Sequence, residues 1–259
     1  MSKFLDVAVS AARKAGKHAF SKMNKIKNIS RKSGYTDLVT NVDRECEQII
    51  IDLVRKEYPS HTIIAEESGK DPGKEEISWV IDPIDGTVNY AHSFPFYCTS
   101  IGVMIDGRVR SGVVFDPFRN ELFTAEEGEG AFLNKKRISV SRIDELRDSL
   151  VATGFAYQPS DRIEVLPYFR DMLKRAQAVR RAGSAALDLC YVACGRLDGF
   201  WEFGLKPWDM AAGQLIVSEA GGEVTTLDGK EFSIFFEKIA ASNGRVHTEL
   251  LEVLNAVSN

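Results

Sequence analysis

Cysteine is scarce in this 259-residue sequence, and its four cysteines form no Cys-X-X-Cys pair. Structural zinc sites commonly use such pairs, so no zinc site is expected. Cys190 and Cys194 lie four residues apart on a predicted helix, where packing between turns accounts for both. Charged residues interrupt the first twenty positions, so no secretory signal is predicted. We therefore expect reduced thiols and a cytoplasmic protein.

Long apolar runs and an excess of positive charge are also missing. No stretch of about 18 apolar residues occurs, so neither a transmembrane helix nor a membrane partner is expected. The chain has 33 basic and 37 acidic residues, a net charge of −4. General nucleic-acid binding usually needs a basic surface, so this charge disfavours it. An acidic protein that binds an anionic substrate needs a local positive charge, which a bound metal ion can supply.

The hydrophobic pattern predicts a mixed α+β chain whose first half is rich in strands. Apolar residues recur at helical spacing from residue 5 to 12 and from 46 to 54, so two amphipathic helices are expected there. Asp106-Gly107 is a hairpin signal between two predicted strands. Three successive strands are predicted at 97–105, 109–115 and 121–125. This meander predicts a largely antiparallel N-terminal sheet.

The second half of the chain is predicted to alternate between strands and helices. Strands are expected at 150–153, 199–203 and 239–242, and helices at 163–176, 184–195, from about 209, and at 246–257. The polar stretch 68–78 contains glycine and proline and is predicted to be a loop. We expect one unit over residues 1–259, built from two closely joined subdomains at about 1–147 and 148–259.

The segment 82–87, Asp-Pro-Ile-Asp-Gly-Thr, carries the strongest chemical signal. A short apolar strand leads into Asp82, and one turn of chain could bring Asp85 to the same place. Gly86 allows a ligand to approach the backbone closely, and a helix that starts there would direct amides at an anion. Carboxylates beside phosphate donors suit magnesium. The competing interpretation is an ordinary turn, since Asp-Pro and Asp-Gly are common turn dipeptides.

Three further segments could join this site. Asp209 opens a predicted helix in the segment 207–222, where it is either a helix N-cap or a rigidly held metal ligand. Glu66 and Glu67 follow a predicted strand, and because adjacent strand residues face opposite sides, only one should point at a site. The segment 36–43 ends at Asp43 and could also be a polar loop with an N-cap.

Together, these segments resemble the inositol monophosphatase family, part of the lithium-sensitive, metal-dependent phosphatases related to fructose-1,6-bisphosphatase. Residues 82–90 (DPIDGTVNY) resemble its first signature and 208–222 (WDMAAGQLIVSEAGG) its second. Glu66-Glu67-Ser68 and 37–43 (DLVTNVD) match its other motifs, in order. The stretch from Arg180 to Trp208 is most similar to bacterial members, while Tyr90 replaces the commoner phenylalanine. The resemblance spans nearly the whole chain.

The resemblance implies a layered α-β-α-β-α sandwich of the sugar-phosphatase type and a role for each matching residue. Metal ligands are implied at Glu66, Asp82, Asp85, Asp209 and the carbonyl of Ile84. Thr87 and Asp43 would position the attacking water. Substrate contacts are implied at Ile84, Asp85, Gly86, Thr87, Arg180, Gly183, Ser184, Ala185, Glu202 and Asp209.

The implied reaction is hydrolysis of a phosphate monoester by a metal-activated water, with two or three Mg²⁺ ions per active site and inhibition by lithium. Inositol-1-phosphate is the expected substrate, since Glu202 matches an acid that binds substrate hydroxyls. The alternatives are a fructose-1,6-bisphosphatase or dual-specificity sugar phosphatase, a 3′-nucleotidase, or a protein that binds the transcription machinery or RNA. Arg180-Arg181 could belong to such a binding surface. A homodimer is expected from the resemblance alone.

Overall fold

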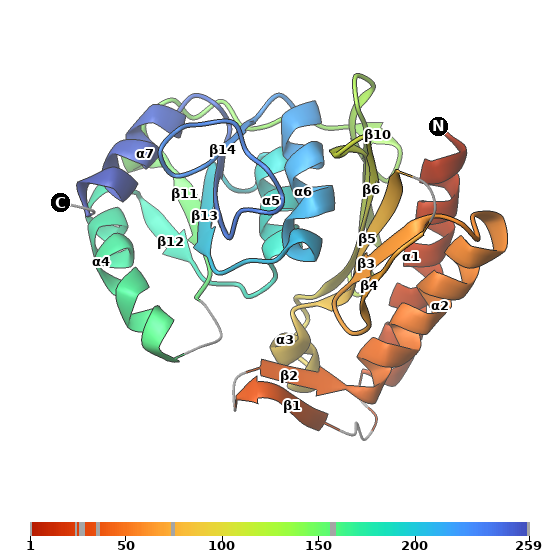
Figure 1. Cartoon of the computed structure of the whole chain (residues 1–259). Coiled ribbons are helices and arrows are strands. Elements are labelled where there is room, and N and C mark those ends of the chain that lie inside the picture. The colour runs from red at the N-terminus through yellow and green to blue at the C-terminus, as the bar shows by residue number, and fades with distance from the viewer. Residues whose placement is uncertain are drawn as a thin grey trace.

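A computed structural model gives the fold of the chain and describes residues 2–23, 25, 29–34, 37–73, 76–155 and 159–257 (Figure 1). Across these ranges, none of the helices has the length and apolar character needed to span a membrane. The described chain forms two large β-sheets and a separate two-stranded hairpin, with helices outside and between the large sheets.

The first sheet has eight strands in the order β10-β9-β8-β7-β6-β5-β3-β4. Its strands are β3 (Thr62–Ala65), β4 (Gly69–Asp71), β5 (Ile77–Asp85), β6 (Cys98–Ile105), β7 (Arg108–Asp116), β8 (Glu121–Glu126), β9 (Gly130–Leu133) and β10 (Lys136–Arg137). Every neighbouring pair is antiparallel except β3 and β5, which are parallel. The prediction of a largely antiparallel N-terminal sheet is confirmed.

The second sheet has five strands in the order β12-β11-β13-β15-β14. Its strands are β11 (Leu150–Thr153), β12 (Ala178–Arg180), β13 (Gly199–Phe203), β14 (Glu223–Thr225) and β15 (Lys238–Ser242). The strands β12, β11 and β13 are parallel, whereas β15 runs antiparallel to both of its neighbours. The carboxyl ends of three parallel strands therefore meet at one edge of this sheet.

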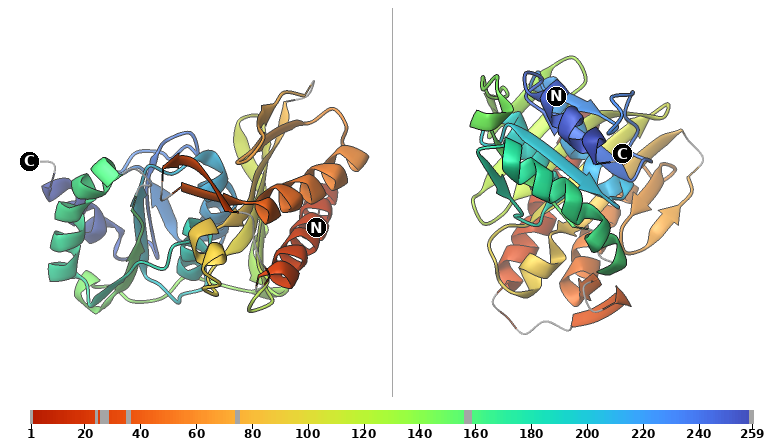
Figure 2. Two further views of the ribbon diagram at one scale, coloured as in Figure 1. Left: turned by 90° about the horizontal axis from the view of Figure 1, so that it is seen from below. Right: turned by 90° about the vertical axis from the view of Figure 1, so that its left-hand side faces the viewer.

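Helices complete five layers (Figures 1 and 2). The outer helices on the first sheet are α1 (Lys3–Lys22) and α2 (Asn41–Glu57); the helices between the sheets are α5 (Ala185–Ala193) and α6 (Pro207–Glu219); the outer helices on the second sheet are α4 (Pro159–Arg175) and α7 (His247–Ala256). The expected α-β-α-β-α sandwich is confirmed. The strands and helices predicted for the second half are also present, each within a few residues of its predicted bounds.

Each layer boundary has its own apolar core, because successive strand residues face opposite sides of a sheet. On β5, Val80 joins the core between the two sheets, while Trp79 and Ile81 pack beneath α1 and α2. On β13, Phe200 belongs to the middle core and Trp201 to the outer core under α4 and α7. The two faces of each sheet are therefore both buried, and the middle core holds α5 and α6 in place.

Helix α6 lies against the first sheet over two glycines. A Cβ atom at Gly102 of β6 would stand 2.8 Å from the Cβ of Ala211, and one at Gly112 of β7 would stand 2.9 Å from the carbonyl oxygen of Ala212. Heavy atoms do not pack that closely, so a side chain at either position would push the helix away. The helix that carries Asp209 is thus seated directly on the sheet backbone.

The structure departs from the sequence prediction in the segment 68–78 and in an unpredicted hairpin. The predicted loop at 68–78 is wrong in part, because β4 covers Gly69–Asp71 and β5 begins at Ile77; residues 74–75 lie outside the described residues. β4 is a short polar edge strand, held by pairing with β3. A polar hairpin of β1 (Ile29–Gly34) and β2 (Asp37–Thr40) was not predicted, because it lacks apolar alternation.

Candidate active site

Three carboxylates from two layers converge beside the middle helices. Asp82 and Asp85 come from β5 and Asp209 from the first turn of α6, and one oxygen of each lies within 4.8 Å of the others. In a regular strand, residues three apart face opposite sides. The β5–β6 pairing shifts register between Asp82 and Asp85, and this irregularity lets both side chains join one cluster.

Burial and mutual repulsion dominate the electrostatics of this carboxylate cluster. The pKa of Asp82 is raised well above its ordinary value, first by burial and then by the neighbouring carboxylates. Burial likewise raises the pKa of Asp209. The pKa of Asp85 rises to about 6 because burial outweighs its hydrogen bonds. Hard carboxylate oxygens grouped in this way are the ligands that Mg²⁺ prefers, and a divalent cation would offset their repulsion, so these residues fit a magnesium site.

Asp85 is held by the start of α5. Its Oδ2 accepts a hydrogen bond from the Ser184 hydroxyl at 2.6 Å and another from the Ala186 amide at 2.7 Å. The Ser184 hydroxyl also caps α5 by accepting from the Leu187 amide. These bonds leave the second oxygen of Asp85 for the cluster. The helical layer between the sheets therefore fixes the orientation of a carboxylate that the first sheet supplies.

We expect Ser184→Ala to weaken Mg²⁺ binding about tenfold, because it removes a bond that orients a ligand carboxylate. Isothermal titration of the purified protein with Mg²⁺ measures this directly. Ser218→Ala on the exposed face of α6 is the matched control, since that hydroxyl donates to the carbonyl of Gln214 in its own helix. Equal Mg²⁺ affinities in the parent and Ser184→Ala proteins would contradict the expected role.

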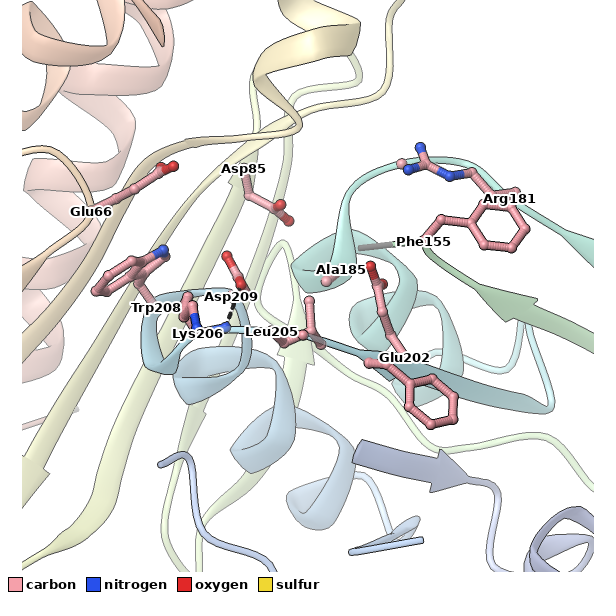
Figure 3. A pocket seen from close by; sticks show the side chains of 13 residues that line it. Glu66, Asp85, Phe155, Arg181, Ala185, Glu202, Leu205, Lys206, Trp208 and Asp209 are labelled. Atoms are coloured by element: carbon pink, nitrogen blue, oxygen red, sulfur yellow. Dashed lines mark hydrogen bonds between the residues drawn. The ribbon is translucent and has the colours of Figure 1, made fainter. Parts of the chain in front are cut away.

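Glu66 lies directly after β3 and faces the same space as Asp85 and Asp209 (Figure 3). Glu67 is absent from the residues that line this space, and its backbone amide instead donates to Glu47 Oε2 at 2.8 Å. Of the two glutamates, Glu66 is the one that lines the cavity; both follow the end of β3 at Ala65. Sequence reasoning missed Glu47, a buried carboxylate of α2 that fastens the turn carrying Glu66.

Thr87 and Asp43 meet on the side of the site nearest α2. The Thr87 hydroxyl lies 3.0 Å from Asp43 Oδ1 and 3.1 Å from the carbonyl oxygen of Ile84. Asp43 also accepts from the backbone amide of Thr40, which caps α2, so the helix start and the site share one residue. Burial raises the pKa of Asp43 to about 6. Gly86 has φ of 97°, a left-handed backbone that favours glycine, at the start of α3 (Thr87–Ala91).

A cavity of about 210 Å³ opens between the carboxylate cluster and the second sheet (Figure 3). Its lining consists of Glu66, Asp85, Phe155, Arg181, Gly183, Ala185, Glu202, Phe203, Gly204, Leu205, Lys206, Trp208 and Asp209. One wall is acidic and carries the candidate metal ligands. The opposite wall presents Glu202 and Arg181 from the second sheet, so with a cation bound at the acidic end the cavity can hold an anion there and a polar group at the other end.

A family model described as the inositol monophosphatase family matches residues 1–259. This chain belongs to that family. It is 46% identical to the inositol-1-monophosphatase of Synechocystis sp. over 258 residues, which cover 98% of this chain and 89% of the relative. It is also 46% identical to the Nus factor SuhB of Haemophilus influenzae, over 97% of this chain and 95% of the relative. The crystal structure of the extragenic suppressor protein suhB from Bartonella henselae has a TM-score of 0.94, 39% identity and 98% coverage of both chains.

Most residues singled out by the family resemblance gather at the cavity. Glu66, Asp85, Gly183, Ala185, Glu202 and Asp209 line it. Ile84 and Thr87 are buried beside it. Ser184 is buried behind the lining, where it bonds Asp85. Arg180 is exposed at the end of β12, and its neighbour Arg181 lines the cavity instead.

Glu202, on the cavity wall opposite the carboxylate cluster, has a pKa well above its ordinary value. Burial raises its pKa to about 8, against the lowering effect of Arg181. The folded chain therefore keeps a proton that the unfolded chain has lost between about pH 4.5 and pH 8, and the free energy of unfolding falls as pH rises through that window. Below the window both states are protonated, and above it the destabilisation is complete.

We expect Glu202→Gln to remove this titration, so that the metal-free variant melts at a higher temperature than the parent at pH 9. The difference should shrink towards zero near pH 4, because the carboxyl is then protonated in both states. Thermal melts of the two proteins across pH 4–9 test the prediction. A difference in Tm that is the same at every pH would show that the carboxyl does not titrate as described.

Proposed function

We propose that this protein is a magnesium-dependent phosphatase that hydrolyses the phosphate monoester of a small polyhydroxylated alcohol, of which inositol-1-phosphate is the leading candidate. The observation that carries the proposal is the cluster of buried Asp82 and Asp85 with half-buried Asp209 at one end of a cavity. Membership of the inositol monophosphatase family supports it. The cavity's volume also suits a small ligand rather than an extended polymer.

Glu66, Asp82, Asp85, Asp209 and the carbonyl of Ile84 would hold the metal, as two or three Mg²⁺ ions. When bound, the ions supply positive charge that neutralises the phosphate and lowers the pKa of water. The chain has a net charge of −4, and the candidate ligands are themselves acidic, so the protein needs that charge before an anion can enter. Glu47 and Ser184 contribute by fixing the segments that carry Glu66 and Asp85.

Thr87 and Asp43 would hold the attacking water. When Asp43 is ionised, the Thr87 hydroxyl donates its one hydrogen to Asp43 Oδ1, and its lone pairs face away to accept a hydrogen bond from water. Asp43 fixes this orientation because Thr40 bonds its other oxygen. The backbone amides of Gly86 and Thr87 stand at the start of α3, where they can donate to phosphate oxygens.

The far wall of the cavity would recognise the alcohol. Glu202 offers hydrogen-bonding oxygens, and Arg181 offers several N–H donors in a fixed fork. Gly183 and Ala185 are small, so they leave room for a sugar-like ring between the wall and the cluster. A ring that carries several hydroxyl groups could satisfy both side chains at once. This arrangement favours a polyol phosphate over a simple alkyl phosphate.

The decisive experiment is a phosphate-release panel with saturating Mg²⁺. It compares inositol-1-phosphate, fructose-1,6-bisphosphate and 3′-phosphoadenosine 5′-phosphate under identical conditions. We expect kcat/KM to be highest for inositol-1-phosphate and release to stop when Mg²⁺ is chelated. Preference for the bisphosphate or the nucleotide would redirect the proposal to a sugar bisphosphatase or a 3′-nucleotidase, and no release from any substrate would overturn it.

A second role, binding to the transcription machinery, is favoured by one specific observation. The relative named Nus factor SuhB is as similar to this chain as the relative named inositol-1-monophosphatase, at 46% identity each. Arg180 supplies an exposed cation for such a surface, outside the cavity. Affinity capture with an Asp85→Asn bait should then retain transcription proteins, and adding Arg180→Glu should release them. Loss of capture with Asp85→Asn alone would count against a role separate from the site.

A further inference from the structure

The wall of the cavity opposite the carboxylates is built where three parallel strands end. In the pairing of β11 with β12, Ala152 stands opposite Arg180, and in the pairing of β11 with β13, Thr153 stands opposite Trp201. Continued by one residue, these registers place Glu202 beside Gly154 and Arg181 beside Thr153, at the same edge of the sheet. Ligands of α/β sheets commonly bind at such carboxyl edges.

Gly154 has no side chain where Glu202 needs room. A Cβ atom at Gly154 would lie 1.9 Å from Glu202 Oε1, 2.0 Å from Cδ and 2.2 Å from Oε2. The carboxyl group of Glu202 thus rests directly on the α-carbon of Gly154, in the volume that any other residue would fill. Gly154 does not have the left-handed backbone found at Gly86. A side chain at Gly154 would therefore displace the Glu202 carboxyl without straining the backbone.

Phe155 holds the second charged group of the same wall. The guanidinium carbon of Arg181 lies 5.9 Å from the centre of the Phe155 ring, within range of a cation–π contact. Both side chains line the cavity, and Figure 3 shows them next to Glu202. The two residues that follow β11 therefore contact the two charged side chains that face the cavity from the second sheet. Gly154 contacts Glu202, and Phe155 contacts Arg181.

We propose that Gly154 and Phe155 are positioning residues that determine substrate specificity, because they place Glu202 and Arg181 to bind the hydroxyl groups of a ring-shaped polyol phosphate. Gly154 does not touch the substrate and acts through Glu202. This inference rests on the proposed function and adds to it the feature that selects the alcohol. It predicts that selectivity between alcohols changes at Gly154, while the carboxylate cluster that binds phosphate is untouched.

The test compares Gly154→Ala with the parent on inositol-1-phosphate and on p-nitrophenyl phosphate, which has no hydroxyl groups to recognise. The added methyl must displace the Glu202 carboxyl, so kcat/KM for inositol-1-phosphate should fall about tenfold relative to p-nitrophenyl phosphate, mainly through KM. Gly199→Ala is the matched control on β13, since its nearest contact would be the side chain of Val151 at 3.3 Å. That variant should leave the ratio between the two substrates as in the parent.

A double-mutant cycle with Glu202→Ala separates positioning from a general loss of structure. Once the carboxyl is gone, Gly154→Ala should change the substrate ratio no further, because its effect is transmitted through that group. The same loss in both backgrounds, or an unchanged ratio in a Gly154→Ala protein with parental circular dichroism, would overturn the inference.

Phe155→Leu gives an independent measurement should the alanine variant not fold. It removes the ring beneath Arg181 and should lower the same ratio about threefold, whereas an unchanged ratio would overturn the inference for Phe155. Failure of the proposed function has a different signature, since the parent itself would then release no phosphate from inositol-1-phosphate.

Discussion

Asp85→Asn should lower kcat/KM for phosphate monoesters at least about 100-fold, because it removes one charge from the carboxylate cluster where a phosphate must be bound. The asparagine oxygen can still accept from the Ser184 hydroxyl and the Ala186 amide, so the local fold should survive. Phosphate release over a range of Mg²⁺ concentrations measures the loss. Unchanged turnover at saturating Mg²⁺ would exclude Asp85 from the site.

The stability of this variant should move in the opposite direction to its activity. The pKa of Asp85 is raised to about 6, so the free energy of unfolding of the metal-free parent falls as pH rises from about 4 through 6. At pH 8 the whole destabilising contribution of this one carboxylate is present. Asparagine does not titrate, so metal-free Asp85→Asn should melt at or above the parental Tm at pH 8. Mg²⁺ should raise its Tm less than that of the parent, since ligands stabilise only the state that binds them.

Asp188→Asn is the matched control for Asp85→Asn. Asp188 is a buried acid one turn further along α5 than Ser184, and burial raises its pKa well above the ordinary value. Burial disfavours the charged form of this carboxyl, and Asp188 is not among the residues that line the cavity, so an amide of the same shape should change turnover and the Mg²⁺ response little. A loss as large as that of Asp85→Asn would mean that any polar change near α5 inactivates the protein.

Thr87→Val should lower kcat about 100-fold or more, within the range expected for loss of a group that handles the attacking water. Valine keeps the shape of threonine but lacks the hydroxyl that lies 3.0 Å from Asp43 Oδ1 and 3.1 Å from the Ile84 carbonyl oxygen. The buried Asp43 Oδ1 would lose its donor, so the free energy of unfolding should also fall by about 1–3 kcal/mol. Steady-state kinetics and thermal melts measure the two effects separately.

Thr87→Ser provides the rescue that separates chemistry from packing. Serine restores the hydroxyl and removes only a methyl group, so most of kcat should return. Mg²⁺ affinity should be close to parental in Thr87→Ser, because serine keeps the hydroxyl beside the carbonyl oxygen of Ile84, itself a candidate metal ligand. If serine and valine reduce kcat equally, the hydroxyl has no part in the reaction.

Local sequence pattern predicted much of the fold because it reflects local physics. The strand at Leu150–Thr153 was predicted with its observed bounds, since a short apolar run there is buried on both faces. The hairpin at Asp106-Gly107 followed from turn chemistry. By contrast, the polar β1–β2 hairpin and the edge strand β4 are held by backbone pairing with a partner strand, and the side chains of such segments carry no matching pattern.

The candidate site was predicted as separate residues and not as an arrangement. The motifs supplied Asp82, Asp85 and Asp209, but not the register shift in β5 that lets two of them face one way. The bond from Ser184 to Asp85 joins residues 99 positions apart, and no local pattern encodes it. The contact between Gly154 and Glu202 depends on strand pairing in the second sheet, which only the folded chain reveals.

The seating of α6 on Gly102 and Gly112 affects how variation among relatives should be interpreted. Neither glycine lines the cavity, yet each lies under the helix that carries Asp209, so a substitution there would shift a candidate metal ligand from a distance. Selection for catalysis should therefore act on these two positions as strongly as on the carboxylates themselves. In a survey of the family, invariance at these glycines would reflect the need to place the helix that carries Asp209. A search for residues that contact a ligand would not find the reason for that invariance.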